Sequence, residues 1–578
     1  MASVCGRVRA LPFRARLIGV QQTAPFSSTS GKNNSQDASS HISRSVDFSD
    51  ESGAYGHVPT TDLLRSLAVL RLCKIPAFVQ HADRLVAFSN KFLGASVTSW
   101  FAKKTFFGHF CAGEDENDIA PVIAQLESRG VGGILDYAAE ADVSTTAVNK
   151  KTEDPRAVAD AEGRDATPYM LRRTRSGISA RTYEYVNEKM CDENKELFES
   201  CINSVHNVSP EGFAAVKLTA LGNPKLLERA SDMLVATSKL FDTIDSSKKG
   251  FLSFDDFATE YPKHFILSDG DTIESVFDRL FGVSSESNRL QRTVDLIEWK
   301  RSLNPKLLSW LALQCIDQGP FYKASLDAEE LGLYADMMAR VDAVCALANE
   351  KNVRLMLDAE QTYFQSAIDA IVLEMQKRYN TTSPIIFNTY QCYLKDSHDR
   401  VARHVERARR EGWIFAAKLV RGAYMTTERA RAAAQGYPDP VHDTIEDTHA
   451  NYHDVFDFVM NEIVAAGKDN IEKRGAVVVA SHNQTSCERA IQRMSEHGIA
   501  PGDGVVYFGQ LLGMADNLTF NLGAQGYSAY KYVPYGPVQE VMPYLIRRAQ
   551  ENSDVLSGAA QESAMMRTEL RNRGIPFV

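Results

Sequence analysis

The chain has 578 residues, 44% of them hydrophobic and 24% charged, so it is long enough for a large core and more than one domain. A formal net charge of −10 argues against a nucleic-acid binder, which would carry a basic excess. The nine cysteines are scattered and never spaced as CxxC, which indicates reduced thiols rather than a disulfide framework or a zinc site. No apolar run reaches the length of about 18 residues that a transmembrane helix needs.

The N-terminus is rich in arginine and serine and poor in acids. Arg7, Arg9, Arg14 and Arg16 all precede the first acidic residue, Asp37. This composition is typical of a mitochondrial transit peptide, and an ordinary disordered tail is the alternative. We expect residues 1–56 to be a transit peptide and disordered leader that carries no fold.

Residues 57–113 are predicted to form a helical arm. Between Thr60 and Phe107, seven Lys or Arg residues are accompanied by only Asp62 and Asp83, and aromatic residues are interleaved with them. Such a segment suits the surface of an anionic membrane. A helical arm that packs on the main domain is the favoured alternative, and both interpretations stay open.

Eight short apolar runs alternate with helical stretches through the rest of the chain. They are residues 132–138, 213–218, 354–358, 385–389, 414–419, 476–480, 505–509 and 529–533. Buried strands that alternate with helices indicate a parallel sheet, and eight such units predict a closed (βα)8 barrel of the TIM type. Neither a GxGxxG nor a Walker A motif is present, so a doubly wound nucleotide fold is the weaker choice.

Most of these runs end on a polar residue, and the carboxyl ends of barrel strands form the catalytic face. The residues are Asp136, Lys217, Asp358, Asn388, Lys418, His482 and Tyr532. Any one of them could be a packing accident. Seven at one rim predict a site.

Two stretches interrupt the alternation. Residues 142–181 are polar and predict a long loop before a helix over 182–205. Residues 237–308 form an insertion that divides the barrel into 114–236 and 309–553, leaving 554–578 as a C-terminal tail. Within the insertion, residues 245–256 resemble an EF-hand loop, with Leu252 in the short β contact, but Lys249 and Asp256 replace two ligand residues. We therefore predict a degenerate, structural EF-hand-like pair and no bound calcium.

A helix is predicted from about Val538, after the last strand. Tyr544, Arg547, Arg548 and Glu551 share one of its faces, and Val541, Leu545 and Ala549 are free to pack elsewhere. Taken alone, this polar face would be a solvated helix surface. Above the polar strand ends of the barrel, however, its two guanidiniums suit a small anion. His449 and His453 have zinc-compatible spacing, but their polar surroundings favour a solvated helix face. With no nucleophile elbow and no metal cluster evident, the chemistry should come from an organic cofactor.

Several segments closely resemble proline dehydrogenase of the animal mitochondrial type. They are LMLDAEQTYFQ, IIFNTYQCYLKD, AAKLVRGAYM, VVASHN, YFGQLLGMADN and YKYVPYGPVQEVMPYLIRRAQEN, with GGILDYAAE and FAAVKLTAL. The resemblance runs from about Glu114 to Ser553 and implies a distorted (βα)8 barrel that holds FAD. It implies oxidation of L-proline to Δ1-pyrroline-5-carboxylate, the first step of proline catabolism, by hydride transfer to flavin N5. Electrons would pass to ubiquinone at the matrix side of the inner mitochondrial membrane, with peripheral membrane contact.

The resemblance also implies roles for individual residues. Lys217, Arg547 and Arg548 would hold the proline carboxylate. Tyr424, Leu511, Tyr532 and Tyr544 would pack around its ring. Asp358 and Glu551 would orient the tyrosines and arginines, and Glu140 would pair with Arg547 as a gate. The flavin would be bound by Ala359, Asn388, Lys418, Val420, Arg421, Gly422, Ala423, Ser481 and His482.

Two alternatives remain. Hydroxyproline dehydrogenase is a close relative in which a serine resembles the position of Tyr532, so the tyrosine favours proline as the substrate. An EF-hand-type adaptor built on a catalytically inactive barrel is the alternative from another class.

Overall fold

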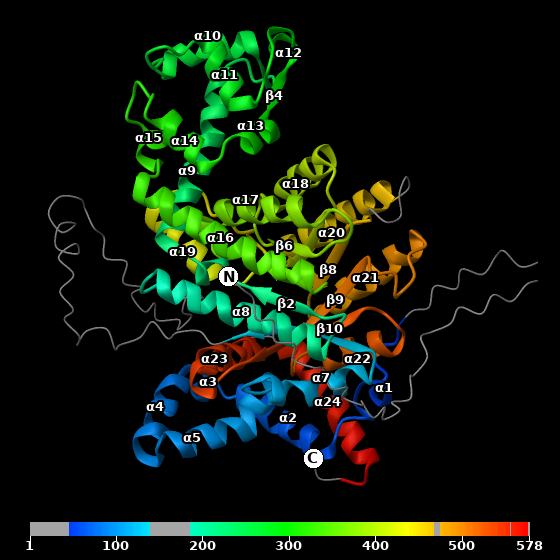
Figure 1. The fold of residues 1–578 in the computed structure, drawn as a ribbon. Coiled ribbons are helices and arrows are strands. Elements are labelled where there is room, and N and C mark those ends of the chain that lie inside the picture. The colour runs from blue at the N-terminus through cyan, green and yellow to red at the C-terminus, as the bar shows by residue number, and fades with distance from the viewer. Residues whose placement is uncertain (1–45, 139–184, 468–473, 555, 576–578) are drawn as a thin grey trace, which may run out of the picture. The chain divides into compact units, whose positions relative to one another are not determined.

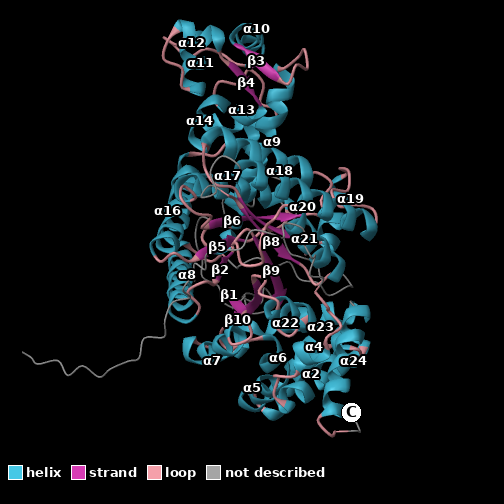
Figure 2. Cartoon of the chain, turned by 90° about the vertical axis from the view of Figure 1, so that its right-hand side faces the viewer, coloured by secondary structure: helices cyan, strands magenta, loops and turns pink. Residues whose placement is uncertain are grey.

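The computed structural model describes residues 46–138, 185–467, 474–554 and 556–575, and within them eight parallel strands close into a barrel (Figures 1 and 2). Around the barrel the strand order is β1-β10-β9-β8-β7-β6-β5-β2. The strands are β1 (Val131–Tyr137), β2 (Phe213–Val216), β5 (Arg354–Leu357), β6 (Ile386–Gln391), β7 (Ala416–Val420), β8 (Ala476–Ala480), β9 (Val506–Leu511) and β10 (Ala529–Tyr535). The predicted barrel is thus confirmed, with each predicted run overlapping one strand.

Helices surround the strands, as Figure 2 shows. They are α7 (Glu116–Glu127), α8 (Glu188–Val208), α9 (Pro224–Ile244), α16 (Ala328–Glu350), α17 (Thr362–Tyr379), α18 (Ser397–Glu411), α19 (Met425–Gln435), α20 (Ile445–Gly467), α21 (Gln484–Glu496) and α22 (Asp516–Ala524). Several begin at a side-chain cap: Asp115 accepts from two backbone amides of α7, and Asp327 forms a capping box with Glu330 at the start of α16. These caps satisfy amides that the first helical turn leaves without partners.

Alternate residues of each strand face opposite layers of the barrel. Phe213, Phe387 and Tyr507 belong to the interior cluster, and their rings lie 5.2–6.3 Å apart in edge-to-face contacts. Residues of the other parity, such as Ile386 and Tyr390, pack with the surrounding helices. The period of two therefore decides which strand-end residues reach the barrel mouth.

The insertion after α9 has the layout of an EF-hand pair. Its elements are β3 (Phe251–Ser253), α10 (Phe254–His264), α11 (Ile273–Phe281), α12 (Glu286–Gln291), β4 (Thr293–Asp295), α13 (Leu296–Ser302), α14 (Pro305–Ala312) and α15 (Pro320–Ala324). The predicted short β contact is confirmed, because Leu252 pairs with Val294. The ammonium of Lys249 lies 3.0 Å from Asp256 Oδ1, so the loop's own cation neutralises that carboxylate.

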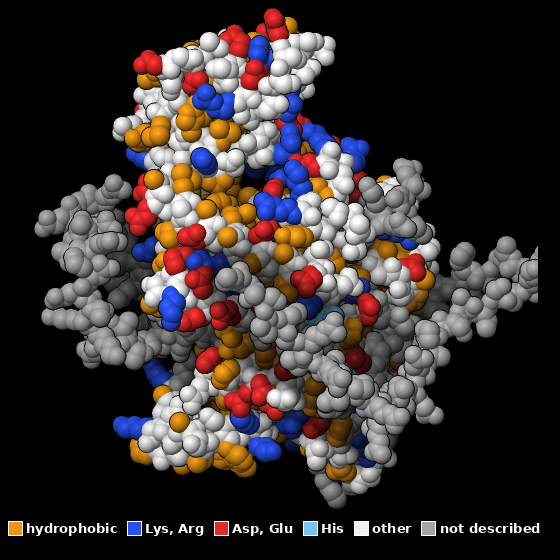
Figure 3. All heavy atoms as spheres, in the orientation of Figure 1, with side chains coloured by type: hydrophobic (Ala, Val, Ile, Leu, Met, Phe, Trp, Pro, Cys, Tyr) orange, Lys and Arg blue, Asp and Glu red, His pale blue; other side chains and the backbone are white. Residues whose placement is uncertain are grey.

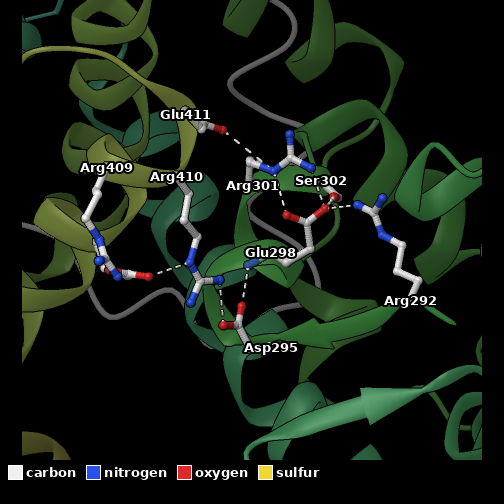
Figure 4. Close-up of polar contacts among 9 residues, drawn as sticks. Arg292, Asp295, Glu298, Arg301, Ser302, Arg409, Arg410 and Glu411 are labelled. Atoms are coloured by element: carbon white, nitrogen blue, oxygen red, sulfur yellow. Dashed lines mark hydrogen bonds and ion pairs between the residues drawn. The ribbon is translucent and has the colours of Figure 1, made fainter.

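In the second half of the EF-hand-like pair, basic side chains likewise neutralise the carboxylates. This half is also joined to the barrel. Glu298 accepts hydrogen bonds from the guanidiniums of Arg292 and Arg301 (Figure 4). Asp295 accepts a 2.6 Å hydrogen bond from Arg410 at the end of α18, and Arg301 lies 3.6 Å from Glu411. Ion pairs that need no metal therefore connect the insertion with α18.

The N-terminal arm is helical, as predicted, and packs with the C-terminal helices α23 (Val538–Asp554) and α24 (Leu556–Asn572). It comprises α1 (Glu51–Tyr55), α2 (Thr60–Cys73), α3 (Pro76–Gln80), α4 (Ala82–Leu93), α5 (Ala95–Ala102), the π-helical turn η1 (Lys103–Phe107) and α6 (Gly108–Phe110). Within the described residues, no helix is both long and apolar enough to cross a bilayer.

Both ends of the fold extend further than predicted. The expectation that nothing folds before about Gly56 is wrong, since Phe48 is buried in the core and α1 packs against α22. The C-terminal tail contains α24, whose Met565, Met566 and Leu570 are buried against α1 and α2. The predicted loop 142–181 lies outside the described residues.

Candidate active site

The carboxyl ends of the barrel strands carry two sets of predicted site residues on different arcs of the rim. Lys418, Arg421, Ser481 and His482 lie in or directly after β7 and β8, which are neighbours. Lys217, Leu511 and Tyr532 come from the arc formed by β9, β10, β1 and β2. Asp358 and Ala359 follow β5, which lies where the two arcs meet. The closed barrel thus separates a predicted cofactor side from a predicted substrate side.

Asp358 links the two arcs. Its Oδ1 is ion-paired with the ammonium of Lys418, and its Oδ2 accepts a 3.3 Å hydrogen bond from the hydroxyl of Tyr532. The Lys418 ammonium lies 5.7 Å from the centre of the Tyr532 ring. Burial, together with the charges of Asp136 and Asp358, holds the pKa of Tyr532 well above its usual value. Tyr532 therefore stays a neutral phenol that donates to a carboxylate.

Lys217 and Glu360 form a second charged group beside Asp358. Lys217 is half-buried at the end of β2, with the inward parity of Phe213 and Ala215. Glu360 is fully buried and accepts from the backbone amide and hydroxyl of Thr219 at 3.2 and 2.7 Å. Burial raises the pKa of Glu360 to about 7, and the charge of Lys217 opposes that rise. Glu360 was not among the predicted site residues, although the acidic triplet of residues 358–360 directly after a strand was a usable signal.

Helix α23 lies over the carboxyl ends of β1 and β9. Its Val541, Leu545 and Ala549 pack in one cluster with Ala138 and Met514, which confirms the predicted packing residues, and Tyr544 of the polar face belongs to the same cluster. Tyr544, Arg547 and Arg548 are all buried, so the polar face is not solvated. The Arg548 guanidinium lies 5.0 Å from the centre of the Tyr544 ring.

Two predicted partners of this helix cannot be placed. Glu140 lies outside the described residues, as does the side chain of Glu551. The gate between Glu140 and Arg547 and the orienting role of Glu551 therefore stay predictions.

Arg421 is the centre of the polar network after β7. Its guanidinium donates to His449 Nδ1 at 2.9 Å, Ser481 Oγ at 2.7 Å and Ser486 Oγ at 3.0 Å. All three acceptors are neutral groups, and within the described residues no carboxylate is paired with Arg421. The ring of Tyr452 lies 4.6 Å beneath the guanidinium. This leaves a fixed positive charge that suits an anionic ligand.

The two histidines at zinc-compatible spacing belong to this network rather than to a solvated helix face, which corrects the predicted environment. His449 accepts from Arg421, and His453 Nε2 lies 2.9 Å from Ser486 Oγ. Burial lowers the pKa of each histidine. Both rings thus support the loop after β7.

His482 joins two neighbouring strand ends. Its Nε2 accepts a 3.0 Å hydrogen bond from the backbone amide of Leu511, which requires the proton of a neutral ring to lie on Nδ1. A residue predicted on the cofactor side thereby fixes the backbone of one predicted on the substrate side. Tyr424, also predicted beside the substrate, is buried as the residue before α19.

Asn388 does not face the barrel mouth, which corrects the set of seven polar strand ends. It has the parity of Ile386 and Tyr390, and its Nδ2 donates to Asp369 on α17 at 3.0 Å. Thr389 and Gln391 have the inward parity instead, and Gln391 Nε2 donates to the Glu360 carbonyl at 2.7 Å. In the sequence, Asn388 and Thr389 both stand at the end of the same apolar run, and nothing in the run showed which of the two side chains faces inward.

Comparison with known proteins decides the family. Residues 119–561 match the family model described as proline dehydrogenase. The chain belongs to the proline dehydrogenase family. It is therefore an oxidoreductase, and the barrel rim and α23 form its candidate active site.

The proline dehydrogenase family includes relatives that align over nearly the whole chain. Proline dehydrogenase 1, mitochondrial, of Homo sapiens is 42% identical, covering 91% of this chain and 90% of that protein. The Caenorhabditis elegans protein of the same name is 37% identical, covering 95% of this chain and 92% of that protein. Hydroxyproline dehydrogenase of Xenopus laevis is 28% identical over 93% and 92%.

A solved structure supports the fold. Proline utilization A (PutA) of Bdellovibrio bacteriovorus has a TM-score of 0.50 and 17% sequence identity, with 88% of this chain covered. The chain spans 39% of that longer protein. At this identity the likeness concerns the barrel architecture alone.

Proposed function

We propose that the protein oxidises L-proline to Δ1-pyrroline-5-carboxylate with FAD as cofactor and ubiquinone as electron acceptor. The observation that carries this proposal is the buried face of α23 with Tyr544, Arg547 and Arg548 above the group of Asp358, Lys418 and Tyr532. Two buried guanidiniums suit a carboxylate, and the phenol rings suit the small apolar ring beside it. The reaction is the first step of proline catabolism.

Residues of the substrate arc would bind and orient proline. Lys217, Arg547 and Arg548 supply three cations for one carboxylate, and a guanidinium offers two parallel donors to its oxygens. Leu511, Tyr532 and Tyr544 would enclose the ring and exclude water, with Tyr424 completing the wall. Asp358 fixes the Tyr532 hydroxyl, so that the ring of Tyr532 keeps one position. Orientation of a bound substrate is the main contribution of such residues to rate.

Residues of the cofactor arc fit a flavin dinucleotide. Arg421 offers a positive charge held by neutral partners, which suits a diphosphate. Within the described residues, the amide of buried Gln361 and the hydroxyl of Thr389 have no hydrogen-bond partner, so polar ligand atoms could satisfy them. Gly422 has φ 145°, and a Cβ there would approach the Tyr393 ring to 2.2 Å, so the loop after β7 requires glycine.

The chemistry that FAD supplies when bound is acceptance of a hydride at flavin N5. Lys418 would present its ammonium to the cofactor from β7, while Asp358 neutralises it from the substrate side. His482 and Ser481 would hold the neighbouring strand end, with Ala359, Val420 and Ala423 lining the same arc. Asn388 supports this arc from the helix layer through Asp369.

Proline is favoured over hydroxyproline as the substrate. The phenol of Tyr532 occupies space that a ring hydroxyl would need, and Asp358 holds the phenol there. Proline dehydrogenases of Homo sapiens and Bos taurus are 42% and 40% identical, whereas the Bos taurus hydroxyproline dehydrogenase is 30% identical. Both observations support the same choice.

We place the protein in mitochondria, peripherally bound to the matrix side of the inner membrane. Relatives carry the word mitochondrial in their names, and the leader of this chain has the arginine and serine content of a transit peptide. A membrane-dissolved quinone as acceptor accounts for the peripheral contact.

Anaerobic titration with proline tests the proposal. The purified full chain should show a flavin spectrum, and proline should bleach the flavin band. Arg548→Met should raise the KM for proline about 10-fold to 100-fold, as expected when a charge-assisted hydrogen bond is lost, with flavin content unchanged. Arg571→Met on the exposed face of α24 is the matched control. A purified chain without a flavin spectrum would favour the inactive adaptor, and an unchanged KM would remove Arg548 from the carboxylate site.

A further inference from the structure

The hairpin formed by α4 and α5 exposes an unusual concentration of large apolar side chains. The helices meet at Gly94, which has φ 83°, and the hydroxyls of Ser89 and Thr98 lie 2.7 Å apart across the hairpin. Among 21 large apolar side chains exposed in the described part of the chain, eight lie between residues 75 and 101. They are Ile75, Leu85, Phe88, Phe92, Leu93, Val97, Trp100 and Phe101.

Seven of these eight side chains belong to the hairpin itself, and four of the seven are aromatic. The rings of Phe88 and Phe92 lie 4.3 Å apart, and those of Trp100 and Phe101 lie 5.3 Å apart. Every described residue of α5 is at least partly exposed. Figure 3 shows apolar side chains gathered at the lower edge of the molecule, over these helices. Single exposed apolar residues are normal, but a contiguous patch indicates an interaction surface.

Cations surround this surface. Arg84, Lys91 and Lys104 are exposed, and the Lys91 ammonium lies 5.9 Å from the centre of the Phe92 ring. Neither Lys91 nor Lys104 forms an ion pair with any residue that the structure describes. Residues 82–104 contain four basic residues, Arg84, Lys91, Lys103 and Lys104, and only one acidic residue, Asp83, in a chain whose net charge is −10. The patch is therefore locally cationic on an anionic protein.

We propose that the α4–α5 hairpin is the docking surface for an anionic lipid bilayer. Aromatic side chains enter the boundary between headgroups and acyl chains, and the lysines and arginine contact the lipid phosphates. A second copy of this chain fits less well, because self-association would place the same cations opposite one another. The hairpin lies in the interface, in agreement with the lack of a membrane-spanning helix among the described residues. This inference deepens the proposed function and rests on it for the membrane-dissolved acceptor.

The docking surface is directly connected with the lid of the candidate active site. Helices α2, α3 and α5 and the turn η1 all contact α23. Phe107 and Phe110 of the arm share one buried cluster with Tyr544 and Leu545 of α23. A bilayer bound to the hairpin would thus lie one layer of helices away from α23. A quinone dissolved in that bilayer would reach the barrel mouth from the same side.

Flotation of the flavin-loaded full chain with lipid vesicles tests the docking surface. The variant Phe88→Ser/Phe92→Ser/Trp100→Ser should bind vesicles of equal parts phosphatidylcholine and phosphatidylglycerol about 100-fold more weakly than the wild type. The matched control, Leu290→Ser/Leu313→Ser/Ile316→Ser, removes side chains that are 53–75% exposed elsewhere and should float like the wild type. Equal flotation of both variants would overturn the proposal.

Further variants test separately the charge of the lysines and the insertion of Trp100 into the bilayer. Lys91→Glu/Lys104→Glu should weaken binding to these vesicles at least about tenfold and leave binding to pure phosphatidylcholine unchanged. Brominated lipid should quench tryptophan fluorescence in the wild type, and Trp100→Phe should abolish the quenching while flotation persists. Quenching that survives Trp100→Phe, or a triple-serine variant that loses only self-association by light scattering, would contradict the hairpin as the lipid contact.

Activity separates this inference from the proposed function. With proline and a soluble dye as acceptor, the triple-serine variant should retain the wild-type rate, because none of its changes lies in the active site. With ubiquinone in the vesicles, its rate should fall in proportion to flotation. A chain that floats without proline-dependent flavin reduction would contradict the proposed function and keep the docking surface. A chain that reduces flavin but floats equally well when the hairpin is changed would contradict the docking surface and keep the proposed function.

Discussion

The hydroxyl of Tyr532 donates a 3.3 Å hydrogen bond to Asp358 across the barrel mouth, and the same carboxylate is ion-paired with Lys418. Asp358→Asn should therefore leave a buried ammonium without its counterion. We expect the free energy of unfolding to fall by about 3 kcal/mol and kcat/KM for proline to fall at least about tenfold. Denaturant unfolding and steady-state kinetics measure the two effects.

Asp443→Asn is the control for this prediction. It breaks the solvent-exposed pair between Lys395 and Asp443, whose charged atoms lie 3.0 Å apart. The loss there should stay below about 1 kcal/mol, since water already screens both charges. Equal effects of the two substitutions would show that the Asp358 pair has no special role.

Tyr532→Ser should change the choice between proline and trans-4-hydroxyproline. Removing the phenol opens space next to Asp358, and the serine hydroxyl can bond to the added oxygen. We expect the ratio of kcat/KM for hydroxyproline to that for proline to rise at least about tenfold. Tyr530→Phe removes a hydroxyl near the amino end of the same strand, away from the barrel mouth, and should leave the ratio unchanged. A constant ratio in Tyr532→Ser would mean that other residues select the substrate.

The buried carboxyl of Glu360 should make stability depend on pH. Burial raises its pKa from the ordinary value of 4.5 to about 7. Between these values the folded protein keeps a proton that the unfolded chain has released, so the free energy of unfolding falls as the pH rises toward 7. Between about pH 5 and about pH 8, the free energy of unfolding of the wild type should therefore fall by up to about 3 kcal/mol more than that of Glu360→Gln.

Chemical denaturation at the two pH values measures the Glu360 effect. Exposed Glu196→Gln should retain the full wild-type pH dependence. Should Glu360→Gln show the same pH dependence as the wild type, Glu360 would be ionised in the folded protein throughout this range.

The EF-hand-like pair should be indifferent to calcium. Lys249 neutralises Asp256, and Arg292 and Arg301 neutralise Glu298. These cationic side chains supply the positive charge that a bound calcium ion would otherwise supply. Calorimetry should give no calcium-binding heat, and Tm should be the same with calcium or with a chelator. Lys249→Asp/Asp256→Glu restores two ligand residues and should make Tm rise with calcium. Stoichiometric calcium binding by the wild-type chain would refute the degenerate assignment.

Much of the architecture follows from sequence patterns. Apolar runs separated by helices specified the eight strands, because buried parallel strands must alternate with the helices that cover them. Helical spacing specified the two faces of α23, and the packing of Val541, Leu545 and Ala549 agrees with it. The cation in place of a ligand at Lys249 was likewise visible in the sequence, because charge repulsion depends on residue type alone.

The sequence by itself determined the strands, the amphipathic lid helix and the family resemblance, since local periodicity and motifs record these. Only the tertiary structure decided which polar strand ends face inward, because both faces of a barrel strand are apolar and give no period-two signal. Asn388 thus faces α17, while Thr389 faces the mouth. The arm shows the same limit: α2 and α4 both carry apolar residues, and only packing revealed that α2 is covered and the α4–α5 hairpin is exposed.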